Sequence, residues 1–419
     1  MAEWLKASAS KADKHMRVSG VQIPPSPPNY TDSTSTPLKG YAMKPIFILT
    51  ISLLLMLSLT STSCSKQAII AEPEEIADIS SAMFRSDPQR SGVYSIAGPQ
   101  KYNPPVWSFM AEDAIESSPA VAHNTVFFGC ADGNVYAVDA YTGILKWKTK
   151  IGIGIYSSPA IFEGIVYIGS DDGKLYAIDA FEGEVIWKAS TDSSINASPL
   201  VYDDYVFVGS ADTYLYAFNR KNGSEVWKFK AEDVFHSSPA ISKDLLYVGN
   251  GDEYVYALEW KTGKERWKFK TTGKVSSSPA LMDDYVYVGS DDGYIYAIDA
   301  NTGYRNWKHL TGDWIYNSPV AYNNVIYVGS FDNKLYSFDS SSGAIRWSIK
   351  LDDILISSPA FNDQTLYIGS ATGWFYAIDA SKGRIIWKHD FKDLISASPT
   401  LFNGRLYIAC ANGILYCIK

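Results

Sequence analysis

The protein has 419 residues, of which 46% are hydrophobic and 14% aromatic, a composition that supports a packed core and excludes disorder as the main state. The net charge of −8 excludes the basic face with which a nucleic-acid-binding protein neutralises phosphates. Four cysteines in a chain of this length exclude a disulfide scaffold.

The first 63 residues have the features of an export signal. Met43 and Lys44 open a short basic region, residues 46–59 are almost wholly apolar, and residues 61–63 are small. The apolar run is short for a membrane span. We predict a signal peptide over residues 43–63, with Met43 as the true start. Residues 1–42 are then an upstream extension that results from a misplaced start codon.

Cys64 directly follows the small residues, as the lipidated cysteine does in bacterial lipoproteins. Those signals usually carry Leu three residues before the cysteine, where this chain has Ser61. We expect lipidation of Cys64, and the alternatives are ordinary cleavage nearby or an uncleaved anchor. Residues 64–100 are expected to be a linker and lead-in to the folded part, residues 101–419.

Several residue types recur every forty residues after residue 100, without slippage. Pro recurs from Pro119 to Pro399, and Tyr recurs from Tyr136 to Tyr416. The Trp series consists of Trp107, Trp147, Trp187, Trp227, Trp267, Trp307, Trp347 and Trp387. Such a fixed period is typical of a repeat architecture.

One repeat unit, residues 157–188, predicts four short strands. Three of them are rich in β-branched and aromatic residues, and the fourth ends at Trp187-Lys188. The turns between them carry glycine, and Asp172-Gly173 is a hairpin signal because glycine accepts a positive φ. Units of four strands and about forty residues indicate propeller blades, with an open solenoid as the competing architecture.

The two ends of the repeat region favour the propeller. Trp107 belongs to a fourth strand with no first three before it, and the last unit stops after three strands. The N-terminal strand therefore completes the C-terminal blade. We predict an all-β, eight-bladed β-propeller of four-stranded antiparallel blades, without the open edges that invite aggregation. The eight Trp side chains are expected to pack between blades.

The segment from Ala137 to Trp147 resembles the tryptophan-docking motif of pyrroloquinoline-quinone (PQQ) repeat propellers, and it recurs in six further units. Phe84 to Gly92 resembles the lead-in of the same family. The resemblance covers residues 84–419. It implies the fold strongly and the function weakly, because one fold hosts many functions.

The family has catalytic and non-catalytic branches. Its quinoprotein dehydrogenases resemble this chain in blade plan but carry long insertions, a vicinal Cys-Cys disulfide over the quinone, acidic and amide Ca²⁺ ligands and an Asp base. Here Cys130, Cys410 and Cys417 are never adjacent and the period has no insertion. We therefore expect no enzyme activity, no PQQ and no calcium; a PQQ-dependent dehydrogenase or a quinone-responsive sensor is the alternative.

The non-catalytic branch includes the outer-membrane assembly lipoprotein BamB, an envelope-located eight-bladed propeller that binds a barrel-inserting partner. The resemblance implies an exported, lipid-anchored scaffold in the periplasm or at the cell surface. Its expected partners are envelope proteins, including a β-barrel assembly complex, and not nucleic acid.

Residues that vary within the fixed repeat are candidates for function. The position three residues before each Pro is predicted to ring the mouth of the central channel. A ligand site for a small polar molecule or a peptide tip is predicted there, formed by Glu116, Tyr156, Asn196, His236 and Tyr316. The simpler alternative is a hydrated funnel with no ligand.

A second varying position follows the hairpin turn and predicts a partner surface. It carries Tyr214, Tyr254, Tyr294 and Trp374. Tyr and Trp are enriched where proteins dock, and local covering of the turn is the alternative. Trp260 and Trp314 are lesser candidates of the same kind.

Two features are interpreted as structural. Ser170 to Gly173 and Ser290 to Gly293 contain paired Asp residues, but a calcium site needs more converging oxygens, so we expect turn chemistry. Cys130 and Cys410 occupy equivalent places in neighbouring blades, and we expect buried free thiols rather than a disulfide.

Overall fold

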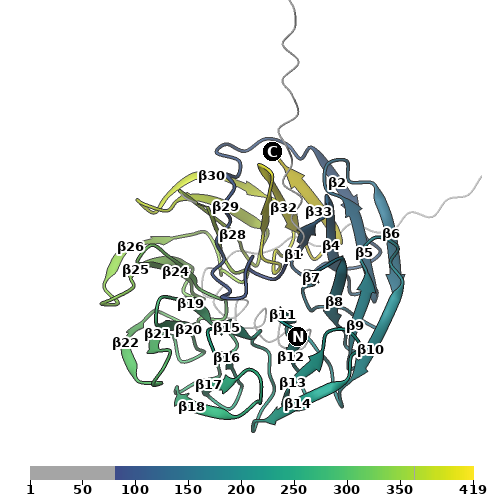
Figure 1. Ribbon diagram of the computed structural model, residues 1–419. Helices are drawn as coiled ribbons and strands as arrows, with labels where there is room; N and C mark the ends of the chain where they lie inside the picture. Colours follow the sequence, from purple (N-terminus) through teal and green to yellow (C-terminus); the bar gives the residue numbers. More distant parts are fainter. Residues whose placement is uncertain (1–80, 363) are drawn as a thin grey trace, which may run out of the picture. The chain divides into compact units, whose positions relative to one another are not determined.

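The computed structural model describes residues 81–362 and 364–419. The upstream extension, the signal peptide, Cys64 and the first part of the lead-in lie outside the described residues. Every regular element in the described part is a β-strand, and the strands form eight antiparallel sheets arranged as a ring (Figure 1). The predicted eight-bladed propeller is confirmed.

Each blade consists of four consecutive strands, except at the closure. Blade 1 contains β3 (Ala120–Ala122), β4 (Thr125–Gly129), β5 (Asn134–Asp139) and β6 (Leu145–Lys150). Blade 2 contains β7 (Ala160–Phe162), β8 (Ile165–Gly169), β9 (Lys174–Asp179) and β10 (Val185–Ser190), and β1 (Ser81–Ala82) adds a fifth strand to it. Blade 3 contains β11 (Leu200–Tyr202), β12 (Tyr205–Gly209), β13 (Tyr214–Asn219) and β14 (Glu225–Lys230). Blade 4 contains β15 (Ala240–Ser242), β16 (Leu245–Gly249), β17 (Tyr254–Glu259) and β18 (Glu265–Lys270).

The second half of the ring follows the same plan. Blade 5 contains β19 (Ala280–Met282), β20 (Tyr285–Gly289), β21 (Tyr294–Asp299) and β22 (Arg305–Leu310). Blade 6 contains β23 (Val320–Tyr322), β24 (Val325–Gly329), β25 (Lys334–Asp339) and β26 (Ile345–Lys350). Blade 7 contains β27 (Ala360–Asn362), β28 (Thr365–Gly369), β29 (Trp374–Asp379) and β30 (Arg384–Asp390). Blade 8 contains β31 (Thr400–Phe402), β32 (Arg405–Ala409), β33 (Ile414–Ile418) and β2 (Trp107–Met110).

The N-terminal strand closes the ring, as predicted. β2 pairs with β33 in the register Trp107↔Cys417 to Met110↔Ile414, so the first and last parts of the repeat region share one sheet. Figure 1 shows the two strands side by side although they stand at opposite ends of the sequence. The outer edge of the last blade is therefore completed by the chain itself.

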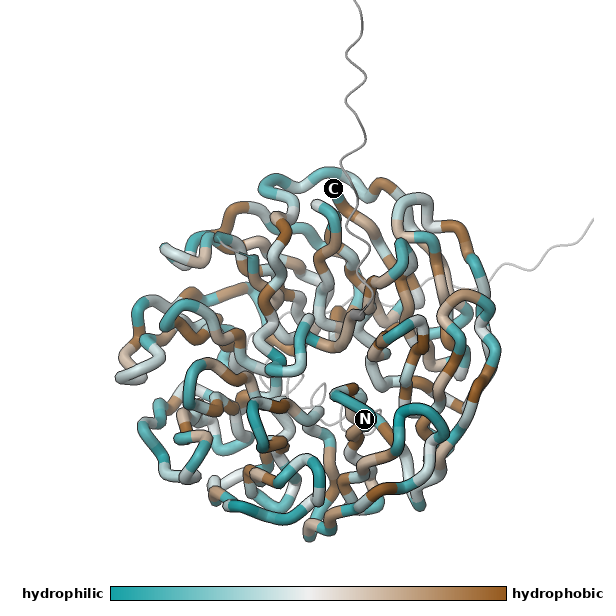
Figure 2. The backbone as a smooth tube through the Cα atoms, in the orientation of Figure 1, coloured by the Kyte–Doolittle hydropathy of each residue, from teal (hydrophilic) through white to brown (hydrophobic). Residues whose placement is uncertain are grey.

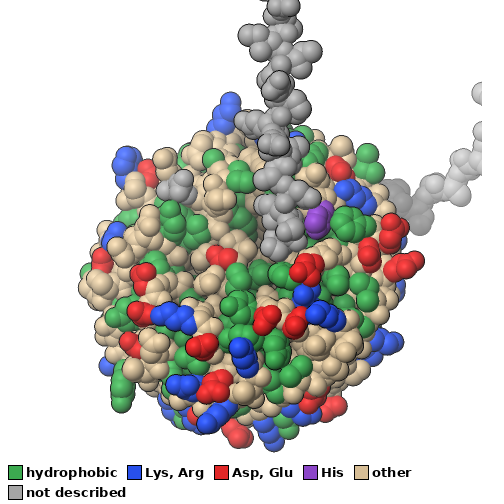
Figure 3. Space-filling model, viewed as in Figure 1, with side chains coloured by type: hydrophobic (Ala, Val, Ile, Leu, Met, Phe, Trp, Pro, Cys, Tyr) green, Lys and Arg blue, Asp and Glu red, His purple; other side chains and the backbone are tan. Residues whose placement is uncertain are grey.

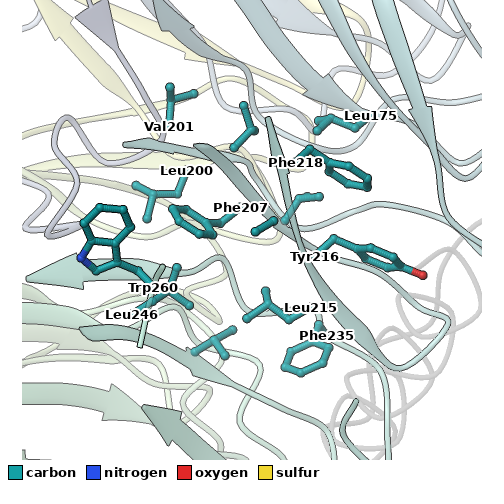
Figure 4. Close-up of a cluster of buried hydrophobic side chains, with 14 of the residues drawn as sticks. Leu175, Leu200, Val201, Phe207, Leu215, Tyr216, Phe218, Phe235, Leu246 and Trp260 are labelled. Atoms are coloured by element: carbon teal, nitrogen blue, oxygen red, sulfur yellow. The ribbon is translucent and has the colours of Figure 1, made fainter. Parts of the chain in front are cut away.

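The hydrophobic core lies between blades, where the facing sheets bury their side chains. One cluster joins blades 2, 3 and 4 and includes Phe207, Phe218 and Leu246, which are at most 2% exposed (Figure 4). Figure 2 shows that hydrophobic stretches follow the strands while hydrophilic residues occupy most turns at the rim. Because each core is shared between neighbours, a single blade cannot bury its own apolar faces.

The Trp series packs between blades, as expected. Seven of the indoles donate Nε1–H to a backbone carbonyl in the turn of the following blade, at 2.7–3.2 Å. Trp267, for example, donates to Ala300 at 2.9 Å and lies on Gly303, where a Cβ would stand 2.7 Å from the indole Cδ2. Gly303 also has φ +75°, so both space and backbone require glycine. The docking motif is therefore one indole and the glycine under it.

The eighth indole uses the lead-in. Trp387 donates to the Pro99 carbonyl at 2.9 Å, so its acceptor lies in the lead-in and not in the turn of a following blade. Tyr367 donates its hydroxyl to the same carbonyl at 3.2 Å. Residues before β2 thus supply the docking turn as well as the closing strand.

A ring of serines surrounds the central axis, and sequence reasoning missed it. The residue before each Pro of the repeat is serine, and its amide donates to the hydroxyl of its counterpart in the next blade at 2.8–3.2 Å. The last of these bonds, from Ser398 to Ser118 at 2.8 Å, links blade 8 to blade 1. The eight hydrogen bonds form a closed cycle.

The lead-in segment occupies the centre of the ring, a position that its sequence did not predict. Its backbone carbonyls from Pro88 to Gly92 accept hydrogen bonds from the innermost strands of blades 4 to 7. Arg85 and Arg90 are buried there, at 3% and 0% exposure. The central channel is therefore filled at the level of these strands.

Both arginines bind backbone carbonyls that point to the axis. Arg90 donates to Pro239 at 3.0 Å and to Pro199 at 2.9 Å, while Arg85 donates to the Pro319 and Pro359 carbonyls. Burial lowers the pKa of Arg85 to about 10 and that of Arg90 to about 9, so both remain charged at neutral pH. Each guanidinium thereby satisfies several buried acceptors at once.

We predict that Trp267→Ala destabilises the ring by about 3–5 kcal/mol, because removal of a large side chain that is only 9% exposed leaves a cavity between the blades. Chemical denaturation measures the effect. The matched control is Tyr304→Ala in the following blade, which is 79% exposed and should change the free energy of unfolding by less than about 0.5 kcal/mol. Equal stability of the Trp267 variant and wild type would contradict the packing role.

Candidate functional site

The candidate mouth residues lie in the connections that lead from each outer strand to the next innermost strand. The innermost strands begin four residues after them, as with Ala120 after Glu116. Contacts between the first strands of neighbouring blades show that these strands surround the axis. The lead-in contacts residues that stand three to five positions after each mouth residue, such as Pro239 and Ile241 after His236. It therefore forms the floor beneath the mouth.

Several polar atoms at this mouth are buried without a hydrogen-bond partner in the described part of the chain. They are Glu116 Oε2, Asn196 Oδ1, Asp171 Oδ1 and Asp291 Oδ1. Glu116 and Asn196 were predicted as site residues, whereas Asp171 and Asp291 were assigned to turns. An unpartnered buried oxygen is costly, so a ligand or water that donates to these oxygens would be stabilising.

Charged side chains of different blades affect one another's pKa at the mouth. Burial raises the pKa of Asp291 to about 6. Burial raises the pKa of Tyr316 to about 12, and the charges of Asp291 and Glu116 add to that shift. Glu116 precedes the first strand of blade 1 and Tyr316 precedes that of blade 6, so the two predicted residues interact electrostatically across the mouth.

Blades 2 and 3 complete this arrangement. Burial raises the pKa of Asp171, and a hydrogen bond from Asn196 partly offsets the shift. Burial, followed by the charges of Glu116 and Asp171, raises the pKa of Tyr156. The structure therefore brings Glu116, Tyr156 and Asn196 together around Asp171.

His236 differs from the other predicted site residues. It is exposed, while Glu116, Tyr156, Asn196 and Tyr316 are half-buried. The connection that carries it also holds Asp233, which pairs with Lys274 of the next blade at 2.9 Å. This side of the mouth therefore has a neutralised carboxylate.

The first Asp of each Asp-Asp-Gly turn could have been recognised from the sequence. Six of the eight blades carry Ala, Gly or Phe at this position, and only Asp171 and Asp291 are acidic. The second Asp has a structural role, since Asp172 accepts the Tyr176 hydroxyl at 2.7 Å and Asp292 accepts the Tyr296 hydroxyl at 2.6 Å. The hydrogen bonds of the turn thus explain the second Asp of each pair. They do not explain the first, Asp171 or Asp291, whose carboxylate lies at the mouth.

The predicted partner surface is partly covered by lysines. Tyr214, Tyr254, Tyr294 and Trp374 are half-buried, and each has a lysine of the same blade's outer strand over its ring, at 3.8–5.3 Å from the centroid. Trp260, a lesser candidate, is 6% exposed and donates to the Lys243 carbonyl at 3.1 Å. Trp260 is therefore part of the core and is not available to a partner.

The cysteines agree with the sequence prediction. Cys130, Cys410 and Cys417 are buried free thiols. Burial raises the pKa of Cys130 and of Cys410 to about 12, so neither is a thiolate at neutral pH. These residues do not fit the vicinal disulfide that the family's dehydrogenases place over the quinone. The expectation that the chain binds neither PQQ nor calcium remains a prediction.

Residues 81–362 and 364–419 contain no group of three or more His, Cys, Asp or Glu side chains arranged to hold a metal ion. In the same part of the chain, no helix has the length and apolarity needed to cross a membrane. Figure 3 shows acidic and basic side chains intermixed on one face, without a region of one sign.

A model of the family described as outer membrane protein assembly factor BamB matches residues 131–252, 211–353 and 332–418. The chain belongs to the BamB family. A search of curated proteins gives no match. BamB from Moraxella catarrhalis has a similar structure, with 20% identity and a TM-score of 0.65 over 75% of this chain and 99% of that one.

Other solved structures share the fold. The computationally designed Ika8 protein is 18% identical, with a TM-score of 0.68 over 76% of this chain and 100% of its own. The quinohemoprotein alcohol dehydrogenase from Comamonas testosteroni is 15% identical, with a TM-score of 0.70 over 82% of this chain and 81% of its own. Likeness at this level of identity shows the fold and leaves the chemistry of the mouth open.

We predict that Asp291→Asn stabilises the protein at pH 7.5 more than at pH 4.5. The folded-state pKa of about 6 lies above the ordinary value, so ionisation costs stability as the pH rises from about 4 to about 6. Asparagine removes this cost, which we expect to be about 1–2 kcal/mol at pH 7.5 after allowance for solvent at the mouth.

Melting temperatures of the variant and wild type at both pH values measure this difference. Asp283→Asn, on an exposed turn of the same blade, is the control for the removal of one carboxylate. A pH-independent effect of Asp291→Asn would contradict the buried, ionisable mouth.

Proposed function

We propose that this protein is a non-catalytic scaffold that binds protein partners at the bacterial envelope and serves the assembly of outer-membrane proteins. The observation that carries this proposal is the match of the BamB family model to most of the repeat region. The regular ring is consistent with it, because every connection between blades in the described residues is short and carries no inserted element. A rigid ring with short connections presents a preformed surface to a partner.

The outer strands of three neighbouring blades support a protein-binding role. Eight of the fourteen exposed large hydrophobic residues of the described chain belong to blades 8, 1 and 2 or to their connections, among them Met110, Ile144 and Phe181 at 60–67% exposure. Exposed apolar side chains gathered on one part of a surface are typical of docking sites. The remaining blades have fewer such residues, so the perimeter is not uniform.

We propose two further contact regions from the residues that vary between repeats. The mouth, with Glu116, Tyr156, Asn196, His236 and Tyr316, suits a small polar ligand or a peptide tip. Two of these residues, Glu116 and Asn196, offer side-chain oxygens without a donor among the described residues. The aromatic column, with Tyr214, Tyr254, Tyr294 and Trp374, offers half-buried rings beside lysines and suits a partner with acidic and apolar groups.

Export and anchoring are part of the proposal. The basic and apolar pattern of residues 43–63 supports secretion, and Cys64 supports a lipid anchor to a membrane. Anchoring would hold the ring close to the membrane in which its partners are embedded. Mass measurement of the mature N-terminus would show directly whether Cys64 carries lipid.

Affinity capture from crosslinked envelopes tests the proposed function. We expect the wild-type chain to capture components of a β-barrel assembly complex. Tyr254→Ala/Tyr294→Ala should capture several-fold less, because it removes two neighbouring rings from the aromatic column. The control is Tyr304→Ala, an exposed aromatic outside that column, which should capture as much as wild type. Absence of such a complex from the wild-type capture would refute the proposed role.

One observation favours a second function, that of a PQQ-dependent dehydrogenase or a quinone-responsive sensor. Glu116 Oε2 and Asn196 Oδ1 lack partners at the mouth, and carboxylate and amide oxygens are ligands that calcium accepts. PQQ with Ca²⁺ should therefore be added to the pure protein. A thermal shift with dye reduction would support the enzyme, and a thermal shift alone would support the sensor. The scaffold role predicts neither a thermal shift nor dye reduction.

A further inference from the structure

A cavity lies in the groove between blades 6 and 7, and none of the candidate mouth residues lines it. Its volume is about 520 Å³, within the range of small-molecule sites. Tyr327 and Trp347 of blade 6 line it together with Gln364 and Ser381 of blade 7. Gln100 of the lead-in also lines it and donates to Thr365 Oγ1 at 3.0 Å.

The repeat provides an internal comparison. The equivalent groove between blades 4 and 5 has a cavity of only about 170 Å³. There Lys243 and Asp284 form an ion pair across the groove at 2.7 Å. The corresponding positions at blades 6 and 7 are Asn323 and Gln364, which cannot form an ion pair. The wider groove therefore lacks the contact that spans its narrower counterpart.

A buried hydroxyl distinguishes the wider groove further. Ser337 lines the cavity, is 0% exposed, and its Oγ has no hydrogen-bond partner among the described residues. Six of the other seven blades have alanine at this position and the last has Cys417. A hydroxyl introduced into an apolar position and left without a partner is unfavourable unless something in the cavity bonds to it.

The remaining lining residues define the chemistry of an occupant. Arg346 is neutralised by Asp339 at 2.8 Å, and the lining positions Asp379 and Lys382 carry opposite charges. The polar groups therefore offer donors and acceptors with little net charge. Trp347 has one side on Gly383, while Tyr327 is 5% exposed, so the inner wall is aromatic and apolar.

We propose that the groove between blades 6 and 7 binds an uncharged saccharide unit. A sugar presents many hydroxyls that both donate and accept, which suits the Ser337 hydroxyl and the Gln100 and Gln364 amides. Its apolar C–H face suits the aromatic wall, and its lack of charge suits the balanced lining. The proposed site is distinct from the mouth and does not depend on the envelope partner.

Titration with glucose and N-acetylglucosamine tests the proposal, read out by tryptophan fluorescence and by saturation-transfer NMR. We expect saturable binding of at least one of them. Glucuronate and glucosamine, the charged counterparts, should bind more weakly. Failure of both neutral sugars to bind, or tighter binding of a charged one, would overturn the assignment.

Two serine–alanine exchanges locate the binding. Ser337→Ala restores the residue found in most blades, so the fold should be kept, and we expect affinity to fall about three- to tenfold through loss of one hydrogen bond. Ala297→Ser makes the reverse exchange at the equivalent position of blade 5 and should leave affinity unchanged. Binding that is insensitive to Ser337→Ala would place the sugar elsewhere and refute the site.

Discussion

The fold depends on closure of the ring, and the closure rests on interactions that repeat identically around the axis. Eight serine amides donate to eight serine hydroxyls in a cycle, and the bond from Ser398 to Ser118 completes it. β2 pairs with β33 on the same blade, and Trp107 then docks on the turn of blade 1. Because every apolar face is shared between neighbouring blades, an opened ring would expose two faces at once. The core, the mouth and the inter-blade grooves all follow from this one constraint.

Most of the architecture was predictable because the period is rigid. A Trp every forty residues predicted indoles that pack between blades, and the structure adds that Trp267 lies on Gly303 of the next blade. The incomplete first and last units specify which strand closes the ring. The sequence also shows a serine before each Pro of the repeat. Serine is common in turns, so its recurrence there does not by itself predict a hydrogen-bonded ring.

The position of the lead-in and part of the mouth were not predictable. Arg85 and Arg90 occur outside the repeat, so no period relates them to the carbonyls of Pro199, Pro239 and Pro319 that they bind. Asp291 was not recognised because the hydrogen bonds of its neighbour Asp292 are enough to explain an Asp-Asp-Gly turn. The sequence therefore offered no reason to assign a separate role to Asp291. In a repeat protein the residues that differ between repeats are the best candidates for function, since the residues that are the same in every repeat serve packing. Ser337 illustrates this at the groove between blades 6 and 7.

Closure can be tested by a disulfide between the two ends of the repeat region. Met110 and Ile414 are direct neighbours in the β2–β33 ladder, and the adjacent Ala111 amide donates to the Gly413 carbonyl at 2.8 Å. This places the pair at a non-hydrogen-bonded position, with a Cα separation suited to a disulfide. Met110→Cys/Ile414→Cys should therefore crosslink quantitatively on oxidation, with a melting temperature at least equal to that of wild type. Met110→Cys/Ser348→Cys, which joins blade 8 to the distant blade 6, should not crosslink within one chain. Failure of the first pair to form its bond in the folded protein would contradict a closed ring.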